Sequence, residues 1–325
     1  MINILILSAG RRVELVKRFK TAAQRLNIEG KVVAADMSDY APAIYFADTY
    51  RLLPRIDSDE YIDALTDICN KENITLIVPT IDTELPILSK NRAYIESHTK
   101  AKILLSSDEV IDICCYKDKT QSFFEKHGFG TPHLLNEADL KRKNYKFPLF
   151  IKPKNGSSSI NTFKVENEDQ LAFFREYIDE PIIQEYIQGT EYSVDVFCDL
   201  ESNPITIVPR IRLAMRSGEI SKGKIDKNRE IIDEARRMVN ILKPVGQITI
   251  QCMKTRDGIK YIEINPRFGG GAPMSIDAGA NSCENIYRIL SGEDVSYNED
   301  YKDGHLFLRF DEGIELTEAK ELVKC

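Results

Sequence analysis

Hydrophobic residues in the first third of the chain fall into two repeating patterns. Residues 2–7 form a continuous apolar run, typical of a buried strand, and residues 13–26 carry apolar side chains at helical spacing. The same patterns predict strands at 31–35, 50–53, 75–78 and 102–105 and helices at 60–70 and 107–115. Strands that alternate with helices indicate a doubly wound parallel α/β domain, which we place at residues 1–112.

The pattern changes in the middle of the chain. A helix at 117–127 ends at Gly128, and a Gly-Thr-Pro sequence then breaks the chain. The remaining predicted elements are strands at 148–153, 160–165, 181–186, 191–198, 204–210 and 306–310 and helices at 168–177, 227–242 and 278–290. We therefore expect a small α+β subdomain at 113–187 and a C-terminal antiparallel-sheet domain at 188–325.

Two stretches of the C-terminal domain, 245–254 and 259–264, alternate apolar with polar residues and predict a β-hairpin. If the loop between them has three residues, with Gly258 in the left-handed region, paired residues have numbers that sum to 514. Gln251 then lies opposite Glu263.

Side chains alternate between the two faces of a strand, so Gln251, Glu263 and Asn265 share one face of this hairpin. The residues expected to point into the body are Ile250, Cys252, Ile262 and Ile264. Hard oxygen donors suit Mg²⁺, and Arg267, just past the strand, is placed to meet an anion beside the metal. An ordinary polar hairpin face would explain Gln251 or Glu263 alone, but the combination favours a metal site.

The segment PTIDTELP, residues 79–86, follows a strand of the predicted parallel sheet. Loops at the carboxyl ends of parallel strands are where open α/β sheets bind ligands. Asp82 and Glu84 are therefore candidates for holding a substrate ammonium group. Helix capping explains them equally well, because Asp or Thr followed by Glu is favoured at a helix start.

Further candidates for substrate binding come from two basic pairs and a glycine run. Arg210 and Arg212 share a strand face and would neutralise a carboxylate, although a structural ion pair explains them nearly as well. Gly270 lies among three glycines that permit close backbone approach. The first turn, SAGRR, lacks the glycine spacing of a dinucleotide fingerprint. Its arginines, Arg11 and Arg12, are candidates for holding an anion at the helix start, although solvated charges explain them better.

Composition narrows the class of protein. The 325 residues are 42% hydrophobic and 29% charged, which indicates folded domains throughout. A net charge of −7 gives no broad positive surface for nucleic acid or an anionic membrane. The apolar run at the start is short and has no basic region before it, so we expect a buried strand of a cytoplasmic protein. The seven cysteines lack paired spacing and are expected to be reduced.

The sequence KNGSSS, residues 154–159, lies between two predicted strands. Such a loop of small residues can close over phosphates with its backbone N–H groups, although by itself it is more often a flexible turn. Taken in order, the loop, the GTE triplet at residues 189–191 and the hairpin resemble the ATP-grasp superfamily, and within it one half of the carbamoyl-phosphate synthetase large chain. The resemblance covers nearly the whole chain and implies a leading α/β domain, a small lid subdomain and a C-terminal sheet domain.

The resemblance also implies roles for individual residues. Lys119 and Lys152 correspond to the basic residues that meet ATP phosphates, and Arg267 to the arginine that holds the acyl phosphate or the transferred phosphoryl group. The implied magnesium ligands are Gln251, Glu263 and Asn265. The remaining nucleotide contacts implied are Lys154, Ser157 and Ser158 in the lid, Gln184, Glu185, Tyr186 and Ile187 beside adenine, and Glu191 on the ribose.

The implied activity is that of an ATP- and Mg²⁺-dependent ligase, with Mn²⁺ as an alternative metal. It would activate a carboxylate as an acyl phosphate and join it to an amine, or less often a thiol, with an amino acid as one substrate. These small molecules are the expected partners, and a homodimer is compatible with the family. The segments PTIDTELP and RFGGGAP depart from the synthetase pattern, so carbamoyl phosphate is not the expected product. A phosphotransferase and a non-catalytic ATP-binding regulator remain open.

Overall fold

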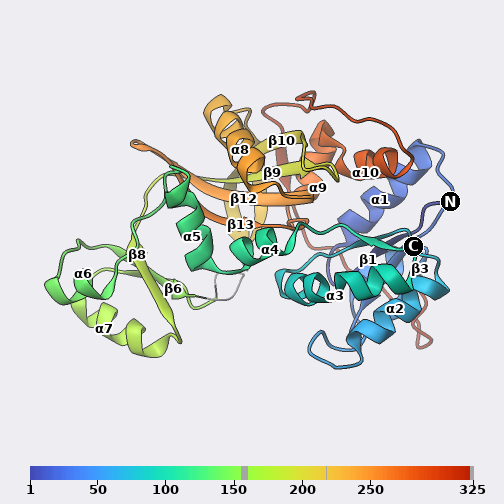
Figure 1. Cartoon of the computed structure of the whole chain (residues 1–325), viewed down its shortest axis with the longest axis horizontal. Coiled ribbons are helices and arrows are strands. Elements are labelled where there is room, and N and C mark those ends of the chain that lie inside the picture. Colours follow the sequence, from blue (N-terminus) through green and yellow to red (C-terminus); the bar gives the residue numbers. More distant parts are fainter. Residues whose placement is uncertain (155–159, 217, 323–325) are drawn as a thin grey trace.

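A computed structural model describes residues 1–154, 160–216 and 218–322 of the chain. These residues form one parallel sheet and two antiparallel sheets, which follow one another along the long axis of the molecule (Figure 1). The arrangement confirms the predicted combination of α/β and α+β structure.

The leading domain is built on a five-stranded parallel sheet with the order β3-β2-β1-β4-β5. Its elements are β1 (Ile4–Ile6), α1 (Val13–Arg25), β2 (Val32–Asp36), β3 (Thr49–Leu52), α2 (Tyr61–Lys71), β4 (Leu76–Val78), α3 (Leu85–His98) and β5 (Lys102–Ile103). Alternate residues of β1 enter separate cores, because Ile4 and Ile6 pack with α1 whereas Leu5 packs with α2 and α3. The doubly wound prediction is confirmed, although it lacked α3.

Helices from the C-terminal part of the chain complete the leading domain. They are α9 (Ala272–Ser275), a π-helical segment (Ile276–Ala280) and α10 (Ser282–Leu290). Phe19 of α1 meets Phe268 and Tyr287 edge-on, with ring centroids 5.8 and 6.2 Å apart. A continuous hydrophobic core therefore joins the leading domain to the end of the chain.

The C-terminal domain is built on a six-stranded antiparallel sheet with the order β13-β12-β9-β10-β11-β14. Its strands are β9 (Thr190–Cys198), β10 (Pro204–Arg216), β11 (Glu219–Ile225), β12 (Gly246–Thr255), β13 (Gly258–Asn265) and β14 (Leu306–Leu308). Helix α8 (Arg229–Leu242) covers one face, and its six predicted core residues are all buried. The prediction missed β11, because lysines separate its few buried apolar residues.

Helices α4 (Asp108–Cys115) and α5 (Lys117–Lys126) also pack against this large sheet. Phe123 and Phe124 of α5 enter the same core as Tyr261 of β13, and the rings of Phe124 and Tyr261 are 5.6 Å apart. This packing corrects the predicted start of the small subdomain at residue 113, since α5 belongs to the core of the large sheet.

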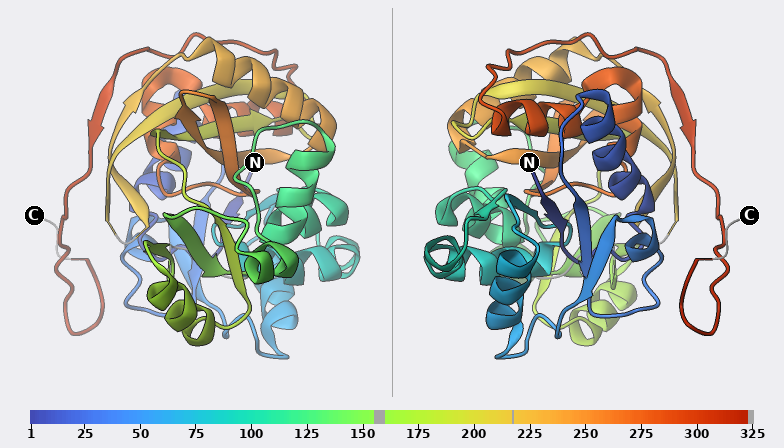
Figure 2. Two further views of the ribbon diagram at one scale, coloured as in Figure 1. Left: turned by 90° about the vertical axis from the view of Figure 1, so that its left-hand side faces the viewer. Right: turned by 90° about the vertical axis from the view of Figure 1, so that its right-hand side faces the viewer.

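The small subdomain lies at one end of the molecule (Figures 1 and 2). Its elements are α6 (Glu137–Arg142), β6 (Leu149–Pro153), β7 (Phe163–Val165), α7 (Glu168–Tyr177) and β8 (Pro181–Glu185), with the strand order β7-β6-β8. Ile151, Ile183 and Leu171 belong to a separate hydrophobic core. The predicted loop over phosphates includes residues 155–159, among them Ser157 and Ser158, which lie outside the described residues.

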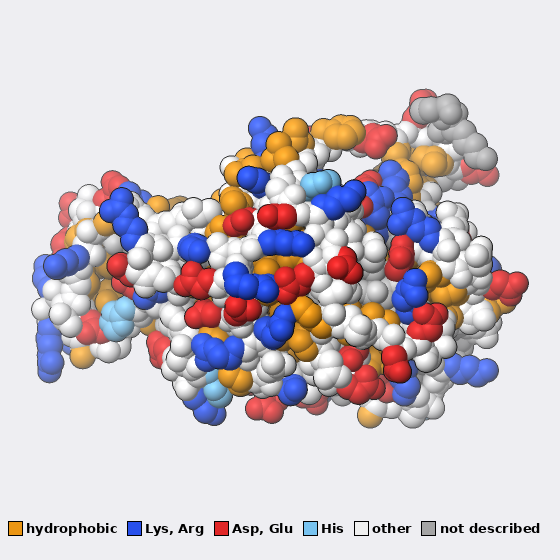
Figure 3. Space-filling view, turned by 90° about the horizontal axis from the view of Figure 1, so that it is seen from above, with side chains coloured by type: hydrophobic (Ala, Val, Ile, Leu, Met, Phe, Trp, Pro, Cys, Tyr) orange, Lys and Arg blue, Asp and Glu red, His pale blue; other side chains and the backbone are white. Residues whose placement is uncertain are grey.

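The chain beyond β14 runs outside the body of the molecule. β14 pairs with β11 at the edge of the large sheet, and the segment that follows projects away from the surface (Figure 3). A salt bridge between Lys320 and Asp39 ties this segment to the leading domain. No helix among the described residues is both long and apolar enough to cross a membrane.

Candidate functional site

The predicted pairing of the hairpin is confirmed at its functional end. Gln251 lies opposite Glu263, as expected for paired residues whose numbers sum to 514. Nearer the turn the register differs by one, because Thr255 pairs with Gly258 and the turn has two residues instead of three. Ile262 is the extra residue that restores the register, so the hairpin contains a β-bulge.

The bulge corrects one sequence prediction. Ile262 was expected to point into the body with Ile250, but it lines a cavity on the opposite side. Tyr261 takes the place in the core and is completely buried. An extra residue shifts the alternation of faces by one position, which a fixed pairing rule cannot predict.

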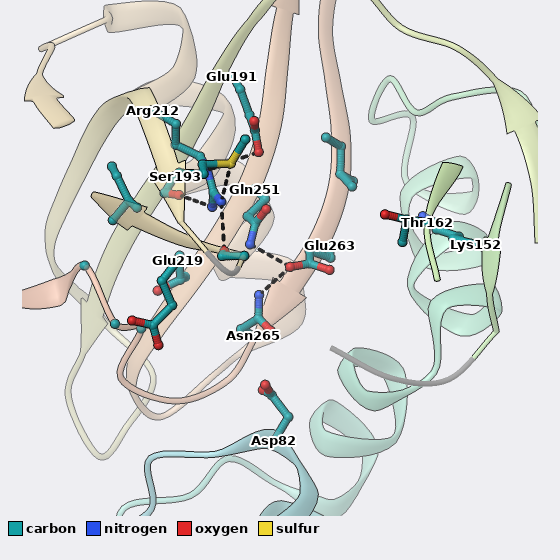
Figure 4. Close-up of a pocket in the computed structure, with 18 of the residues that line it drawn as sticks. Asp82, Lys152, Thr162, Glu191, Ser193, Arg212, Glu219, Gln251, Glu263 and Asn265 are labelled. Atoms are coloured by element: carbon teal, nitrogen blue, oxygen red, sulfur yellow. Dashed lines mark hydrogen bonds and ion pairs between the residues drawn. The ribbon is translucent and has the colours of Figure 1, made fainter. Parts of the chain in front are cut away.

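The three predicted metal ligands converge on this face of the hairpin (Figure 4). The Oε1 atom of Glu263 accepts hydrogen bonds from Nε2 of Gln251 at 2.6 Å and from Nδ2 of Asn265 at 3.0 Å. Both amide groups therefore contact the same carboxylate oxygen. Among the described residues, at this site or elsewhere, no group of three or more His, Cys, Asp or Glu side chains is arranged to hold a metal ion.

A cavity of about 610 Å³ opens over these three side chains. Its volume lies within the range of small-molecule sites. All three structural units line it: Arg12 and residues 80–83 from the leading domain, β6 and β8 from the small subdomain, and the large sheet. The cavity is therefore an inter-domain site at the carboxyl-terminal edge of the parallel sheet, where such sheets bind ligands.

Lys152 lies in the cavity wall opposite the hairpin and is only 8% exposed. Burial lowers its pKa to about 8, although Glu263 acts in the opposite direction by favouring the charged form. Lys117, at the start of α5, also lines the cavity, and burial lowers its pKa as well. Its Nζ donates to the carbonyl of Pro153 at 3.1 Å.

The assignment of Lys119 to the ATP phosphates is corrected by its position. Lys119 does not line the cavity, and its Nζ lies 2.6 Å from Asp112 on the surface of the protein. Lys117 and Lys119 differ by two residues on one helix, so their side chains project in different directions. Lys154, predicted to belong to the lid, forms a 3.0 Å ion pair with Asp118 and also lies outside the cavity lining.

The residues predicted to contact adenine and ribose all line the cavity. They are Gln184, Glu185, Tyr186, Ile187 and Glu191. Glu191 forms an ion pair with Arg212 at 3.1 Å. Burial raises the pKa of Glu191, Arg212 lowers it and Glu263 raises it, with a net upward shift.

Arg267 forms an ion pair that spans two domains. Its Nη2 lies 2.6 Å from Oδ2 of Asp82 and 3.1 Å from Oδ1 of Asn265. Its Nε is buried and has no hydrogen-bond partner among the described residues. The guanidinium thus lies beside the candidate metal ligands and retains an unused donor.

The prediction for Glu84 is wrong. Glu84 is completely buried inside the leading domain, where it accepts hydrogen bonds from Ser8 at 2.5 Å and Tyr61 at 3.0 Å. Burial raises its pKa to about 7, although those hydrogen bonds act in the opposite direction. Asp82 and Glu84 sit in one short helical turn, and only Asp82 faces the cavity.

Arg210 and Arg212 share a strand face that borders the cavity, as predicted, but both have structural partners. Arg210 is 1% exposed and makes two hydrogen bonds to Asp195, at 2.8 and 3.0 Å. Asp195 is itself buried, so the alternative of a structural ion pair holds for Arg210. Arg210 is therefore not available to neutralise a substrate carboxylate.

The glycine run packs closely against charged protein side chains. A Cβ atom at Gly270 would lie 2.8 Å from Nη1 of Arg12 and 2.8 Å from Oε2 of Glu219. One at Gly271 would lie 2.6 Å from Nη1 of Arg210. The glycines therefore permit a close approach, as predicted, and the groups that approach them are side chains of the protein itself. Sequence patterns did not indicate the Arg12–Glu219 pair, because its members lie 207 residues apart.

Two family descriptions match the chain. Residues 4–101 match the PylC-like, N-terminal domain, and residues 114–271 match the ATP-grasp domain. The chain thus carries an ATP-grasp domain behind a PylC-like N-terminal domain, which confirms the resemblance found in its motifs. Relatives named as ligases and synthases agree with the prediction of an ATP-grasp enzyme.

Individual relatives are distant. Carbamoyl-phosphate synthase from Methanobrevibacter smithii is 24% identical over 140 residues, which cover 42% of this chain and 38% of that one. D-alanine–D-alanine ligase from Bacillus anthracis is 22% identical over 241 residues, covering 66% of this chain and 79% of the ligase. The chain thus spans well under half of the synthase it matches.

Solved structures with the same fold include the biotin carboxylase domain of 2-oxoglutarate carboxylase from Hydrogenobacter thermophilus, in a complex that contains MgADP. The TM-score is 0.73 at 16% identity, and the match covers 94% of this chain and 73% of the other. At this identity the likeness establishes the fold.

Proposed function

We propose that the chain is an ATP- and Mg²⁺-dependent ligase that activates a carboxylate as an acyl phosphate and joins it to an amine. One observation carries the proposal: three oxygen-bearing side chains of the hairpin converge between a buried lysine and an arginine in a single cavity. The relatives named as ligases and the ATP-grasp domain support the same class of reaction.

The hairpin donors fit Mg²⁺. Gln251, Glu263 and Asn265 offer one carboxylate and two amide groups, and hard oxygen ligands are those that Mg²⁺ prefers. Both amides donate to Glu263 through nitrogen in the described arrangement. A half-turn of the Gln251 amide presents its oxygen instead. The Asn265 oxygen, which accepts from Arg267, would have to give up that hydrogen bond to bind the metal. When bound, Mg²⁺ would neutralise charge on the phosphates.

The nucleotide would lie between the small subdomain and the hairpin. Lys152 and Lys117 are placed to bind the phosphates, and phosphate oxygens would favour the charged form of Lys152, whose pKa burial lowers to about 8. The backbone of residues 184–187 would pair with adenine, and Glu191 with the ribose hydroxyls. Contacts to the phosphoryl groups would then provide mainly positioning and charge neutralisation.

Arg267 would hold the carboxylate that is activated. The carboxylate oxygen attacks the γ-phosphorus and ADP leaves; the amine nitrogen then attacks the acyl carbon and inorganic phosphate leaves. Asp82 already neutralises Arg267, so a substrate carboxylate must replace it. Asp82 would then be available for an ammonium group, which suits an amino acid as the activated substrate.

The proposal is tested by trapping the acyl phosphate. The purified protein is incubated with ATP, Mg²⁺, hydroxylamine and a panel of amino acids and other small carboxylates, and hydroxamate and ADP are measured. Equal amounts of both products with one acid would support the ligase. ADP with a stable phosphorylated product would instead indicate a phosphotransferase, and tight ATP binding without ADP a regulator.

A further inference from the structure

Three charged side chains from distant parts of the chain meet on the opposite side of the hairpin from Lys152. Arg12 lies at the start of α1, Glu219 begins β11 and Arg309 directly follows β14. Oε1 of Glu219 lies 2.6 Å from Nη1 of Arg12, and its Oε2 lies 3.1 Å from Nη1 of Arg309. Figure 4 shows Glu219 across the hairpin residues from Lys152.

This cluster has a surplus of positive charge. The other described arginines of the cavity wall each pair with one carboxylate: Arg210 with Asp195, Arg212 with Glu191 and Arg267 with Asp82. Glu219 alone among these carboxylates serves two arginines. The two guanidinium groups and one carboxylate of the cluster sum to a charge of +1.

The three residues have different access to the cavity. Arg12 and Glu219 line it, whereas Arg309 lies behind Glu219 and also donates to the carbonyl of Ile220 at 3.0 Å. Nη1 provides the one side-chain hydrogen bond of Arg12 within the described structure. Its Nε and Nη2 therefore remain available, and its side chain is 18% exposed.

Building on the proposed ligase, we propose that this end of the cavity binds an anionic group of the amine substrate through Arg12, and that Arg309 is a positioning residue. The anionic group is a carboxylate or a phosphate, because either accepts two hydrogen bonds from a guanidinium. When the substrate takes up Arg12, Arg309 keeps Glu219 neutralised. Without Arg309, Glu219 would compete with the substrate for Arg12.

Two local features keep the cluster in place. Burial would raise the pKa of Glu219, but the charges and hydrogen bonds of Arg12 and Arg309 outweigh it and lower the pKa to about 2. Glu219 is therefore ionised at any working pH, and the net charge of the cluster stays constant. Gly270 has no Cβ to displace Arg12 or Glu219, which would both lie 2.8 Å from it.

A purely structural role for the cluster makes a different prediction. A clamp between domains would affect neutral and anionic amines alike when it is weakened. The ion pair of Arg216 with Asp311 offers a matched comparison, because it also ties the segment after β14 to the large sheet and is more exposed. Arg216→Ala should loosen that segment while keeping all three side chains of the cluster in place.

The experiment measures binding directly and does not require turnover. Glycine and O-phosphoethanolamine are titrated into the full chain with MgADP, alongside glycinamide and ethanolamine, which lack the anionic group. The Arg12 side-chain Nε–Hε resonance, assigned with Arg12→Lys, reports on binding. We expect at least one anionic probe to shift it in the millimolar range and both neutral-tailed amines to leave it unchanged. The responding probe distinguishes carboxylate from phosphate.

Variants then separate the positioning role from structure. Arg309→Ala should weaken binding of the anionic probe about tenfold, as expected for one charge-assisted interaction. Arg309→Lys should restore part of the affinity, and Arg216→Ala should match the original protein. Thermal unfolding and MgADP affinity of each variant show whether the fold is intact.

The proposal is overturned if no anionic probe shifts the Arg12 resonance, or if neutral and anionic amines shift it equally. If Arg309→Ala and Arg216→Ala weaken binding of the anionic probe equally, Arg309 is not a positioning residue. Hydroxamate formation with hydroxylamine, which needs no anion, reports separately on the ligase. A protein that forms hydroxamate but fails the binding test retains the proposed function, and the converse result would retain the anion site alone.

Discussion

The two ends of the cavity are built in different ways. At the hairpin, Gln251 and Glu263 lie twelve residues apart and meet because two neighbouring strands pair. At the opposite end, Arg267 and Asp82 lie 185 residues apart and Arg12 and Glu219 207 residues apart. Local geometry therefore determines the first set of contacts, and the packing of whole domains determines the second.

The two ends also differ in charge. Among the described residues, Glu263 has only amide partners at hydrogen-bond distance, which leaves a carboxylate suited to a cation. At the far end, arginines neutralise Asp82 and Glu219, with one arginine in excess. One cavity thus combines a carboxylate suited to a cation with a surplus guanidinium suited to an anion, and variants at each end should have separable effects.

The largest effect is expected from Glu263→Gln. Loss of the one carboxylate in the hairpin cluster should lower ATP turnover roughly a hundredfold to a thousandfold, because charge stabilisation is lost where phosphoryl transfer occurs. ADP release at saturating Mg²⁺ measures it. Asp257→Asn, in the exposed turn of the same hairpin, is the matched control and should retain full activity. Undiminished turnover in Glu263→Gln would remove the metal site from the hairpin.

A smaller effect separates two lysines of one helix. Lys117→Met should raise the KM for ATP roughly tenfold or more, the cost of one hydrogen bond to a charged group. Lys119→Met should leave it unchanged, because the side chain of Lys119 is paired with Asp112 outside the cavity. Steady-state kinetics at varied ATP concentration measure both KM values. A raised KM in Lys119→Met with an unchanged KM in Lys117→Met would instead support the phosphate-binding role first assigned to Lys119.

These lysines show how far sequence patterns reach. The bounds predicted for α7 match the structure, and the register at Gln251 and Glu263 was predicted from an assumed three-residue loop, although the turn has two residues. The bulge at Ile262 and the missing α3 mark the limit, since a bulge leaves no signal in the alternation and α3 buries only three apolar residues. Motif resemblance assigned phosphate binding to Lys119, whereas the lysine of α5 that lines the cavity is Lys117, two positions earlier.

The same limit explains the far end of the cavity. A sequence segment does not reveal which of two nearby carboxylates faces a cleft, so Asp82 and Glu84 were given one role. The fold separates them: Asp82 reaches Arg267 in another domain, and Glu84 reaches Ser8 and Tyr61 in its own. Long-range partners of this kind follow only from the assembled structure.

The pKa of Lys152 predicts a pH dependence confined to the nucleotide end. In the free protein this pKa is about 8, and phosphates would raise it in the complex. Below pH 8 the lysine is already charged, so the KM for ATP should be constant. Above pH 8 binding must take up a proton, and the KM should rise up to about tenfold per pH unit. Lys152→Arg, which stays charged, should give a flat profile; a parallel rise there would assign the titration to another group.

The smallest kinetic effect is expected from Glu84→Gln, which should leave the KM of every substrate unchanged and alter stability instead. Glu84 has a pKa of about 7 in the folded chain, against an ordinary value of 4.5. Below pH 4.5 both folded and unfolded chains hold the proton. Between pH 4.5 and 7 the unfolded chain ionises first, so the folded state loses stability as the pH rises, by roughly 3 kcal/mol at most.

Thermal unfolding at pH 5 and pH 8 measures this term, with Glu84→Gln as the comparison. The amide keeps an oxygen acceptor for Ser8 or Tyr61 and cannot ionise. The unfolding temperature of the variant should therefore fall less between pH 5 and pH 8 than that of the original protein, by roughly 5 °C. Other groups titrate equally in both proteins and cancel. A variant whose unfolding temperature falls as much as that of the original protein would show that Glu84 ionises freely, and a raised substrate KM would return it to the cavity beside Asp82.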